Sequence, residues 1–100
     1  MTTRLLLRER TTRKGLLVSV CDADVLGQTF QGDEVSLEVT EEFYGGDPSG
    51  DEAVLESLSE AAVANLVGTR AVELAIEAGY VDAANVLELD GTRHAQFLRM

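Results

Sequence analysis

The sequence predicts an α+β protein, a two-layer α/β sandwich in which a mainly antiparallel sheet of about five strands is covered by two main helices. Three patterns support this prediction. Apolar residues recur at helical spacing over residues 49–79, which is typical of helices that pack on a core. Residues 4–9 alternate around Leu5 and Leu7, and residues 16–21 place Leu16, Val18 and Val20 on one face of an extended segment, which is typical of strands. An Asp-Gly pair at 90–91 separates two apolar stretches and indicates a hairpin.

The first half of the chain is predicted to be mostly extended. Residues 4–9 and 16–21 form an antiparallel hairpin around a turn at 11–15. Residues 22–27 make one helical turn, with an aspartate to begin it and a glycine to end it. Alternation over 35–40 predicts a third strand with one solvent-exposed face.

The middle of the chain is predicted to form the two helices. Ser49 and Glu52 have the spacing of a capping box and begin the first helix. Its apolar face is Leu55, Leu58, Ala62 and Leu66. Gly68 ends this helix, since glycine tolerates the left-handed conformation that follows helix ends. Thr69 caps the second helix, which closes at Gly79.

A helix-turn-helix DNA-binding arrangement is not favoured for this helix pair. The second helix carries one cation, Arg70, against Glu73 and Glu77, whereas phosphate contact requires Lys and Arg. After the helices, residues 86–89 and 92–98 are predicted to pair as the last hairpin. We expect the chain to form a single domain over residues 1–100.

Charge is unevenly distributed along the chain. The net charge is −10, from 18 acids and 8 bases, and Lys14 is the only lysine. Residues 1–14 hold five bases and one acid, whereas residues 15–100 hold three bases and 17 acids. Acid excess with few lysines is typical of a protein from a salt-rich cytoplasm, where a highly charged surface stays solvated. An ordinary acidic protein of a mesophile is the alternative.

Several classes of protein are not expected from this sequence. No apolar run approaches the length of a membrane span, and the apolar residues 5–7 are too few for a signal peptide. The lone Cys21 cannot form a disulfide within the chain and fits a reducing compartment. One cysteine and one histidine cannot build a structural zinc site. We therefore expect a cytoplasmic protein that does not associate with a membrane and binds no metal or cofactor.

Two groups of residues are candidates for binding. Arg8, Arg10, Arg13 and Lys14 cluster at the tip of the first hairpin, which is either a solvated hairpin end or a phosphate-contacting tip. Tyr44, Asn65, His94 and Gln96 would line one polar cleft if the last hairpin packs near the junction of the helices. Stacking on a tyrosine with amide hydrogen bonds to base edges is a common way to read single-stranded RNA. The alternative is that the amide and the imidazole make structural hydrogen bonds.

Four segments resemble a known family in their order and spacing. They are Cys21-Asp22 with Leu26-Gly27-Gln28-Thr29-Phe30, then Phe43-Tyr44-Gly45-Gly46, then Ala64-Asn65-Leu66-Val67-Gly68, then Gly91 with His94-Ala95-Gln96. Over about residues 3–97 the chain is similar to the archaeal family called domain of unknown function 424. The resemblance implies a small two-layer α/β protein from an archaeon and, with this composition, a halophilic one. The family has no established activity and is sometimes labelled predicted RNA-binding. Gln28 and Arg93 stand where a lysine and a proline are expected.

Three hypotheses of function follow. The leading one is a noncatalytic binding module for RNA or the translation apparatus. The second is a protein-interaction or assembly factor, for which a homodimer is one arrangement. The third is a small enzyme that uses His94 with Cys21 or a carboxylate, although acids beside Cys21 would raise the pKa of its thiol. No catalytic residue is assigned from the sequence.

Overall fold

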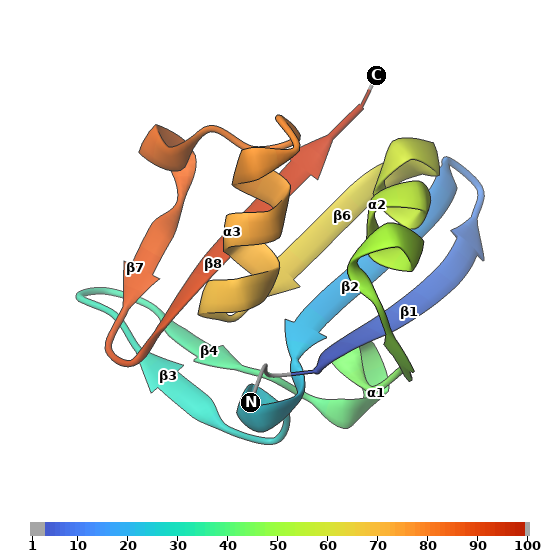
Figure 1. The fold of residues 1–100 in the computed structure, drawn as a ribbon. Helices are drawn as coiled ribbons and strands as arrows, with labels where there is room; N and C mark the ends of the chain where they lie inside the picture. The colour runs from blue at the N-terminus through green and yellow to red at the C-terminus, as the bar shows by residue number, and fades with distance from the viewer. Residues whose placement is uncertain (1–3, 100) are drawn as a thin grey trace.

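A six-stranded sheet forms the centre of the computed structural model, which describes residues 4–99 (Figure 1). Its strand order is β5-β1-β2-β6-β8-β7. The strands are β1 (Leu5–Thr12), β2 (Gly15–Asp22), β5 (Asp47–Ser49), β6 (Ala61–Val67), β7 (Leu87–Leu89) and β8 (Thr92–Leu98). All neighbours pair antiparallel except β2 and β6, which are parallel.

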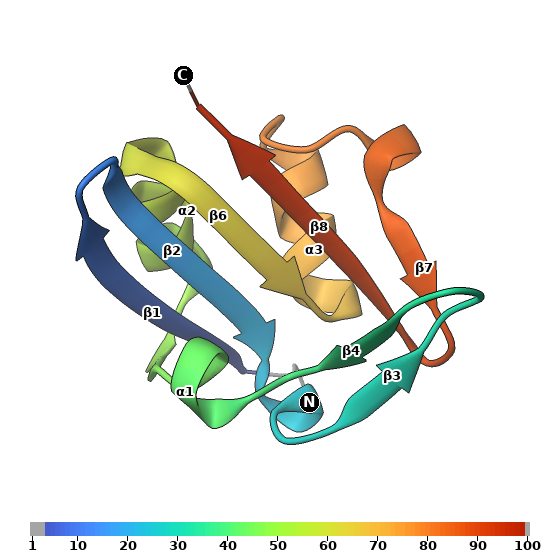
Figure 2. The same cartoon turned by 180° about the vertical axis from the view of Figure 1, so that it is seen from behind.

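The two faces of this sheet are covered differently. Helices α2 (Asp51–Glu60) and α3 (Thr69–Glu77) lie side by side on one face (Figure 1). The other face is covered over only part of its length, as Figure 2 shows. The cover consists of helix α1 (Glu41–Tyr44) and a separate hairpin of β3 (Thr29–Gln31) and β4 (Ser36–Glu38). Short 3-10 turns, η1 (Ala23–Val25) and η2 (Ala83–Asn85), complete the fold.

Each covered face has its own hydrophobic core. The core beneath α2 and α3 is built on fully buried side chains that include Val18, Val20, Val54, Leu58, Leu66 and Val72. The core beneath α1 and the β3–β4 hairpin contains Leu6, Cys21, Phe30, Val39, Tyr44, Val67 and Leu89. Burying one large apolar side chain contributes about 1.5–3 kcal/mol. Packing therefore holds these short helices, which would be marginal alone in water.

The predicted hairpins at both ends of the chain are confirmed. β1 and β2 pair antiparallel over their whole lengths, and β7 and β8 pair around the turn at 90–91. The helical turn predicted at 22–27 is the 3-10 turn η1, and the strand predicted at 35–40 is β4. That strand pairs with β3 rather than with the main sheet.

The prediction that one helix extends to residue 67 is wrong. The helix ends at Glu60, and residues 61–67 form β6, which lies between β2 and β8 in the sheet. Ala64 and Leu66 face the helices, whereas Asn65 and Val67 face the other side. A strand buried on both faces reads as a continuous apolar run, and a short run of this kind matches helical spacing equally well. The sheet therefore has more strands than expected.

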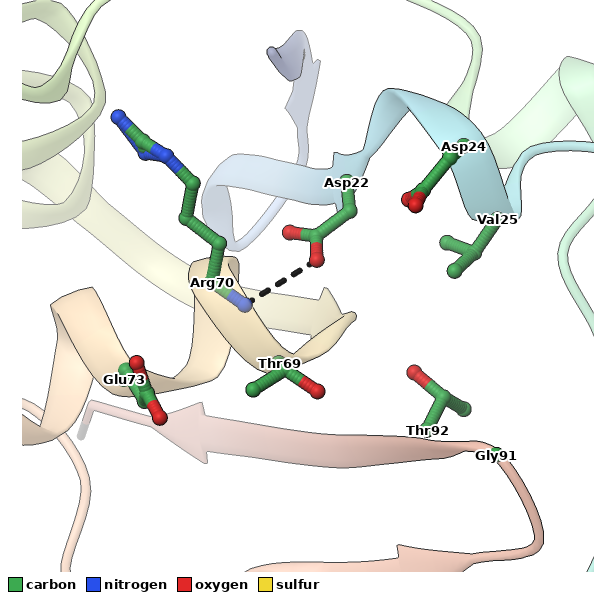
Figure 3. Close-up of a pocket in the computed structure, with 8 residues that line it drawn as sticks. All are labelled: Asp22, Asp24, Val25, Thr69, Arg70, Glu73, Gly91 and Thr92. Carbon is green, nitrogen blue, oxygen red and sulfur yellow. Dashed lines mark hydrogen bonds between the residues drawn. The ribbon is translucent and has the colours of Figure 1, made fainter. Parts of the chain in front are cut away.

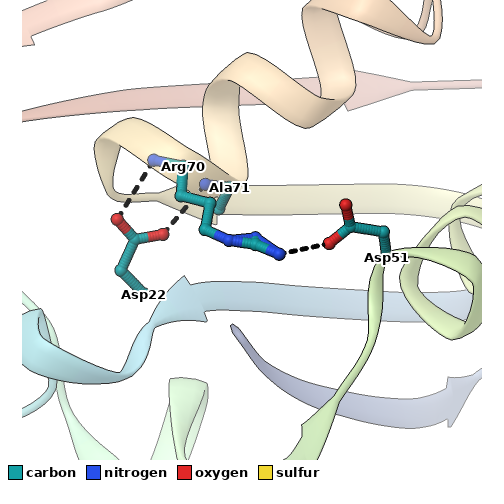
Figure 4. A network of polar contacts seen from close by, with 4 residues as sticks. All are labelled: Asp22, Asp51, Arg70 and Ala71. Atoms are coloured by element: carbon teal, nitrogen blue, oxygen red, sulfur yellow. Dashed lines mark hydrogen bonds and ion pairs between the residues drawn. The ribbon is translucent and has the colours of Figure 1, made fainter. Parts of the chain in front are cut away.

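The predicted helix caps are also corrected. Gly50 is the N-cap of α2 and makes no side-chain cap, while the Ser49 hydroxyl donates to the Asp47 carbonyl. Gly68 begins α3 instead of ending the preceding helix. The cap of α3 comes from a residue far away in sequence, because the Asp22 carboxylate accepts hydrogen bonds from the N–H groups of Arg70 (3.1 Å) and Ala71 (2.9 Å) (Figure 4).

Candidate functional site

Part of the sheet surface opposite the helices lies beyond α1 and the β3–β4 hairpin (Figure 2). We call this surface the open face. Its residues follow from the strand register, because side chains of paired residues point to the same side of a sheet. They are Arg8 and Arg10 of β1, Leu17 and Ser19 of β2, Val63 and Asn65 of β6, and Gln96 and Leu98 of β8.

One row of polar side chains crosses the open face. Arg8 pairs with Ser19, Ser19 with Asn65, and Asn65 with Gln96. Arg8–Ser19 and Asn65–Gln96 are opposed on antiparallel strands, with Cβ atoms about 4.5–5.5 Å apart, whereas Ser19 and Asn65 are neighbours on the parallel pair β2–β6, whose strands lie about 4.8 Å apart. The row therefore carries a guanidinium, a hydroxyl and two amides in line across four strands. Ser19 is buried, Arg8 and Asn65 are half-buried, and Gln96 is exposed.

A second row, next to the polar one, is mostly apolar. Arg10 pairs with Leu17, Leu17 with Val63, and Val63 with Leu98. Leu98, at the end of this row, is 67% exposed. The open face thus combines hydrogen-bonding groups with an accessible apolar strip.

Two arginines of the open face are held in place by α1. Arg8 Nη1 donates to the Gly45 carbonyl at 2.9 Å, and Arg10 Nη2 donates to the Glu42 carbonyl at 3.2 Å. These bonds satisfy carbonyls at the end of the helix that have no partner within it. A guanidinium has five N–H donors, so both side chains keep donors for a ligand. Arg13 and Lys14 are exposed in the β1–β2 turn.

The strand acids among residues 4–99 all lie on the helix side of the six-stranded sheet. Register places Glu9, Asp22, Asp47 and Glu88 there. Glu9 accepts a hydrogen bond from the Ser57 hydroxyl of α2, and Glu88 pairs with Arg93 at 2.9 Å. A chain of net charge −10 therefore presents one sheet surface with arginines and without a carboxylate from its strands.

The structure does not bring Tyr44 to this surface. Tyr44 is 4% exposed and packs edge-on against Phe43, with 4.9 Å between ring centroids. Burial raises the pKa of its phenol, and its backbone carbonyl lies 3.9 Å from the Cys21 thiol. Its ring therefore cannot stack on a base, and the predicted cleft of Tyr44, Asn65, His94 and Gln96 lacks this member. Asn65 and Gln96 lie side by side on β6 and β8.

Cys21 and His94 are too far apart to act as a catalytic pair. Val67 lies between them, paired with Cys21 on one side and with His94 on the other. Two strand spacings separate the two side chains by about 10 Å. Burial, with Asp22 and Asp24 nearby, raises the pKa of the thiol from 9.0 to about 12, and burial lowers the pKa of His94 below its usual 6.5. The thiol is therefore protonated at neutral pH and has no imidazole within hydrogen-bond reach to activate it.

A second feature is an acidic hollow of about 410 Å³ at the start of α3, which sequence reasoning missed (Figure 3). Its lining consists of Asp22, Asp24, Val25, Thr69, Arg70, Glu73, Gly91 and Thr92. Burial raises the pKa of the Asp22 carboxyl, and the two N–H groups that it accepts from α3 oppose this. Only the Asp-x-Asp after a predicted strand marked this place in the sequence.

Together these features define a small α/β protein with helices on one side of a sheet and a half-open second side. The chain belongs to the family described as "Protein of unknown function (DUF424)", which matches residues 9–100. It is similar to a crystal structure described as that of an uncharacterized conserved protein from Methanopyrus kandleri. The two share 25% identity with a TM-score of 0.78, over 97% of this chain and 95% of the other.

A search of curated proteins found no match. Among residues 4–99, no helix has the length and apolar character needed to cross a membrane.

Proposed function

We propose that this protein is a noncatalytic binding module whose open face contacts single-stranded RNA. The observation that supports this most is the polar row of Arg8, Ser19, Asn65 and Gln96, on a surface that lacks strand carboxylates in a strongly acidic chain. Acids on the helix side would repel phosphate, whereas the strands contribute arginines and no carboxylate to this face.

The chemistry of the open face suits RNA in two ways. Arg10, Arg13 and Lys14 lie along the β1 side and can neutralise phosphates. The amides of Asn65 and Gln96 carry both donors and acceptors, which base edges require. Since Tyr44 is buried, a base would stack on a guanidinium plane, which RNA-binding proteins also use.

We further infer that the protein works in a salt-rich archaeal cytoplasm, with RNA of the translation apparatus as its partner. At molar salt the Debye length is about 3 Å, so long-range attraction to phosphate is weak. Recognition would then depend on hydrogen bonds and stacking, for which the polar row is suited. Acid excess, a single lysine and the family resemblance support this environment.

The proposal is tested by fluorescence anisotropy with a labelled 12-nucleotide single-stranded RNA at several KCl concentrations. Gln96→Ala should weaken binding about three- to tenfold by removing a base-edge hydrogen bond. Arg10→Gln should lower the salt slope by about one phosphate contact.

Arg99→Gln is the matched control. Arg99 also donates to a backbone carbonyl, that of Ser59, but it lies over the rings of Tyr80 and Phe97 on the helix side of the sheet. Binding by this variant should equal that of the wild type. Absence of binding to single-stranded RNA, duplex RNA and single-stranded DNA would refute the proposal.

A second candidate function, assembly with another copy of the chain, is favoured by one observation. β7 pairs only with Thr92–His94, so within the described residues Ala95–Leu98 has no partner strand on its outer edge. Leu87 and Leu98 beside this edge are 43% and 67% exposed. An antiparallel β8–β8 pair would cover both. Light scattering of the wild type and of Leu98→Lys, over a range of salt, distinguishes a dimer from a monomer.

A further inference from the structure

The acidic hollow at the start of α3 lies apart from the open face. Asp22 at the end of β2, Asp24 of η1 and Glu73 of α3 supply three carboxylates. Arg70 is the one cation of its lining, and its guanidinium points away from the hollow to Asp51, with 2.6 Å between Nη2 and Oδ1 (Figures 3 and 4). The side chains that face the hollow therefore carry a net negative charge.

An anion does not fit this hollow, although it lies at a helix N-terminus. The N–H groups that would bind an anion there already bind the Asp22 carboxylate, at 3.1 Å from Arg70 and 2.9 Å from Ala71. Gly68 has a φ of 115° and no side chain, which lets that carboxylate approach the start of α3 closely. What remains at the surface of the hollow is mainly hydrogen-bond acceptors.

Thr92 is the group in the hollow that lacks a partner. It is 5% exposed, and its Oγ1 has no hydrogen-bond partner within residues 4–99. Figure 3 shows the hydroxyl directed from the start of β8 into the space between Thr69 and Val25. An unpaired buried hydroxyl is unfavourable, because it has lost its hydrogen bonds to water. A hydroxyl is also an acceptor, so a donor from a ligand would satisfy it.

We propose that this hollow binds an organic cation with N–H donors, a guanidinium or a primary alkylammonium group. Such a group donates to Thr92 Oγ1 and to the free lone pairs of Asp22, and its charge is balanced by Asp24 and Glu73. The hollow is of the size of small-ligand sites. Either a free amine or an arginine or lysine side chain of a protein can supply this chemistry.

The test is a titration of the ¹⁵N-labelled full chain, followed by amide chemical shifts. Ethylguanidinium and butylammonium chloride should shift the amides of Thr69, Gly91 and Thr92. Tetramethylammonium chloride carries the charge without N–H donors, and urea carries the donors without charge, so both should leave these amides unchanged. Equal shifts with tetramethylammonium would reduce the effect to ionic screening and overturn the proposal.

Two variants test the groups that are assigned to the site. Thr92→Val keeps the shape and removes the hydroxyl, and it should weaken binding of ethylguanidinium at least about tenfold. Asp24→Asn removes an exposed carboxylate at the rim and should weaken it about threefold. Glu60→Gln, which removes one exposed charge at the far end of α2, is the control and should bind normally.

The source of the cation is distinguished by comparing agmatine with the peptide acetyl-Gly-Arg-Gly-amide. Tighter binding of agmatine indicates a free amine, and tighter binding of the peptide indicates a protein side chain; both support the site. Thr92→Val should retain the wild-type spectrum away from the hollow and unfold no earlier than the wild type, because it removes an unpaired polar group. Unchanged affinity in this folded variant would overturn the proposal.

Discussion

Replacement of Asp22 by alanine removes the long-range cap of α3. The carboxylate is 6% exposed and accepts two hydrogen bonds, one of them from the buried N–H of Ala71. Removal of an N-cap costs about 0.5–2 kcal/mol. A buried N–H left unpaired belongs at the upper end of that range, so we expect a loss of about 2 kcal/mol in the free energy of unfolding at pH 7. This corresponds to about 8–16 °C in Tm for a chain of this size.

The assay is urea unfolding followed by far-UV circular dichroism, with Asp82→Ala as the matched control. Asp82 also accepts an N–H, from Ala84 at 3.0 Å, but it caps the short, exposed turn η2. That variant should lose less than about 0.5 kcal/mol. Equal losses in the two variants would refute the view that Asp22 joins β2 to α3.

The stability lost in Asp22→Ala should depend on pH. Burial raises the folded-state pKa of Asp22 above 3.8, so the stability that this group contributes is full below pH 3.8 and decreases as pH rises through the folded-state pKa. The difference between the wild type and Asp22→Ala should therefore be larger near pH 4 than at pH 7. A difference that grows with pH would mean that the carboxylate is stabilised in its charged form.

Three further predictions concern single residues. Gly68→Ala should destabilise more than Gly79→Ala in urea unfolding: both glycines have positive φ, but a Cβ at Gly68 would collide with the Asp22 side chain, whereas at Gly79 it meets open space. Cys21 should react with iodoacetamide at pH 8 at least about a thousandfold more slowly in the folded protein than in urea, because a pKa of about 12 and burial suppress its thiolate. Reaction at the rate of the unfolded chain would contradict the burial of Cys21 in the core beneath α1 and the β3–β4 hairpin. His94 should titrate below 6.5 by NMR, so stability falls as pH drops below 6.5, and His94→Gln should flatten this slope; a titration above 6.5 would contradict its burial.

The hairpins could be predicted from the sequence because their signals are local. The apolar residues of β1 and β2 on either side of a short turn, and the Asp-Gly turn before β8, each lie within one short segment. β6 could not be separated from the helix before it, because Leu58, Ala62 and Leu66 have helical spacing while Ala64 and Leu66 also alternate with Asn65 and Val67. What decides its conformation is pairing with β2 and β8 on either side, which is tertiary.

The site was predictable only in part for the same reason. Asn65 and Gln96 are candidates because each is an amide among apolar neighbours, and the strand register places them side by side. Tyr44 is a candidate because its ring could stack on a base, but α1 turns it into the core beneath the sheet. Thr92 carries no signal at all, because an ordinary threonine becomes notable only when its hydroxyl is buried without a partner.

One measurement tests the central proposal most directly: mapping of amide chemical shifts when the 12-nucleotide RNA is added to ¹⁵N-labelled protein in molar KCl. Shifts should concentrate at Arg8, Ser19, Asn65 and Gln96, and the amides of α2 and α3 should not move. Shifts centred on the helices, or a spectrum that RNA leaves unchanged at every salt concentration, would contradict it.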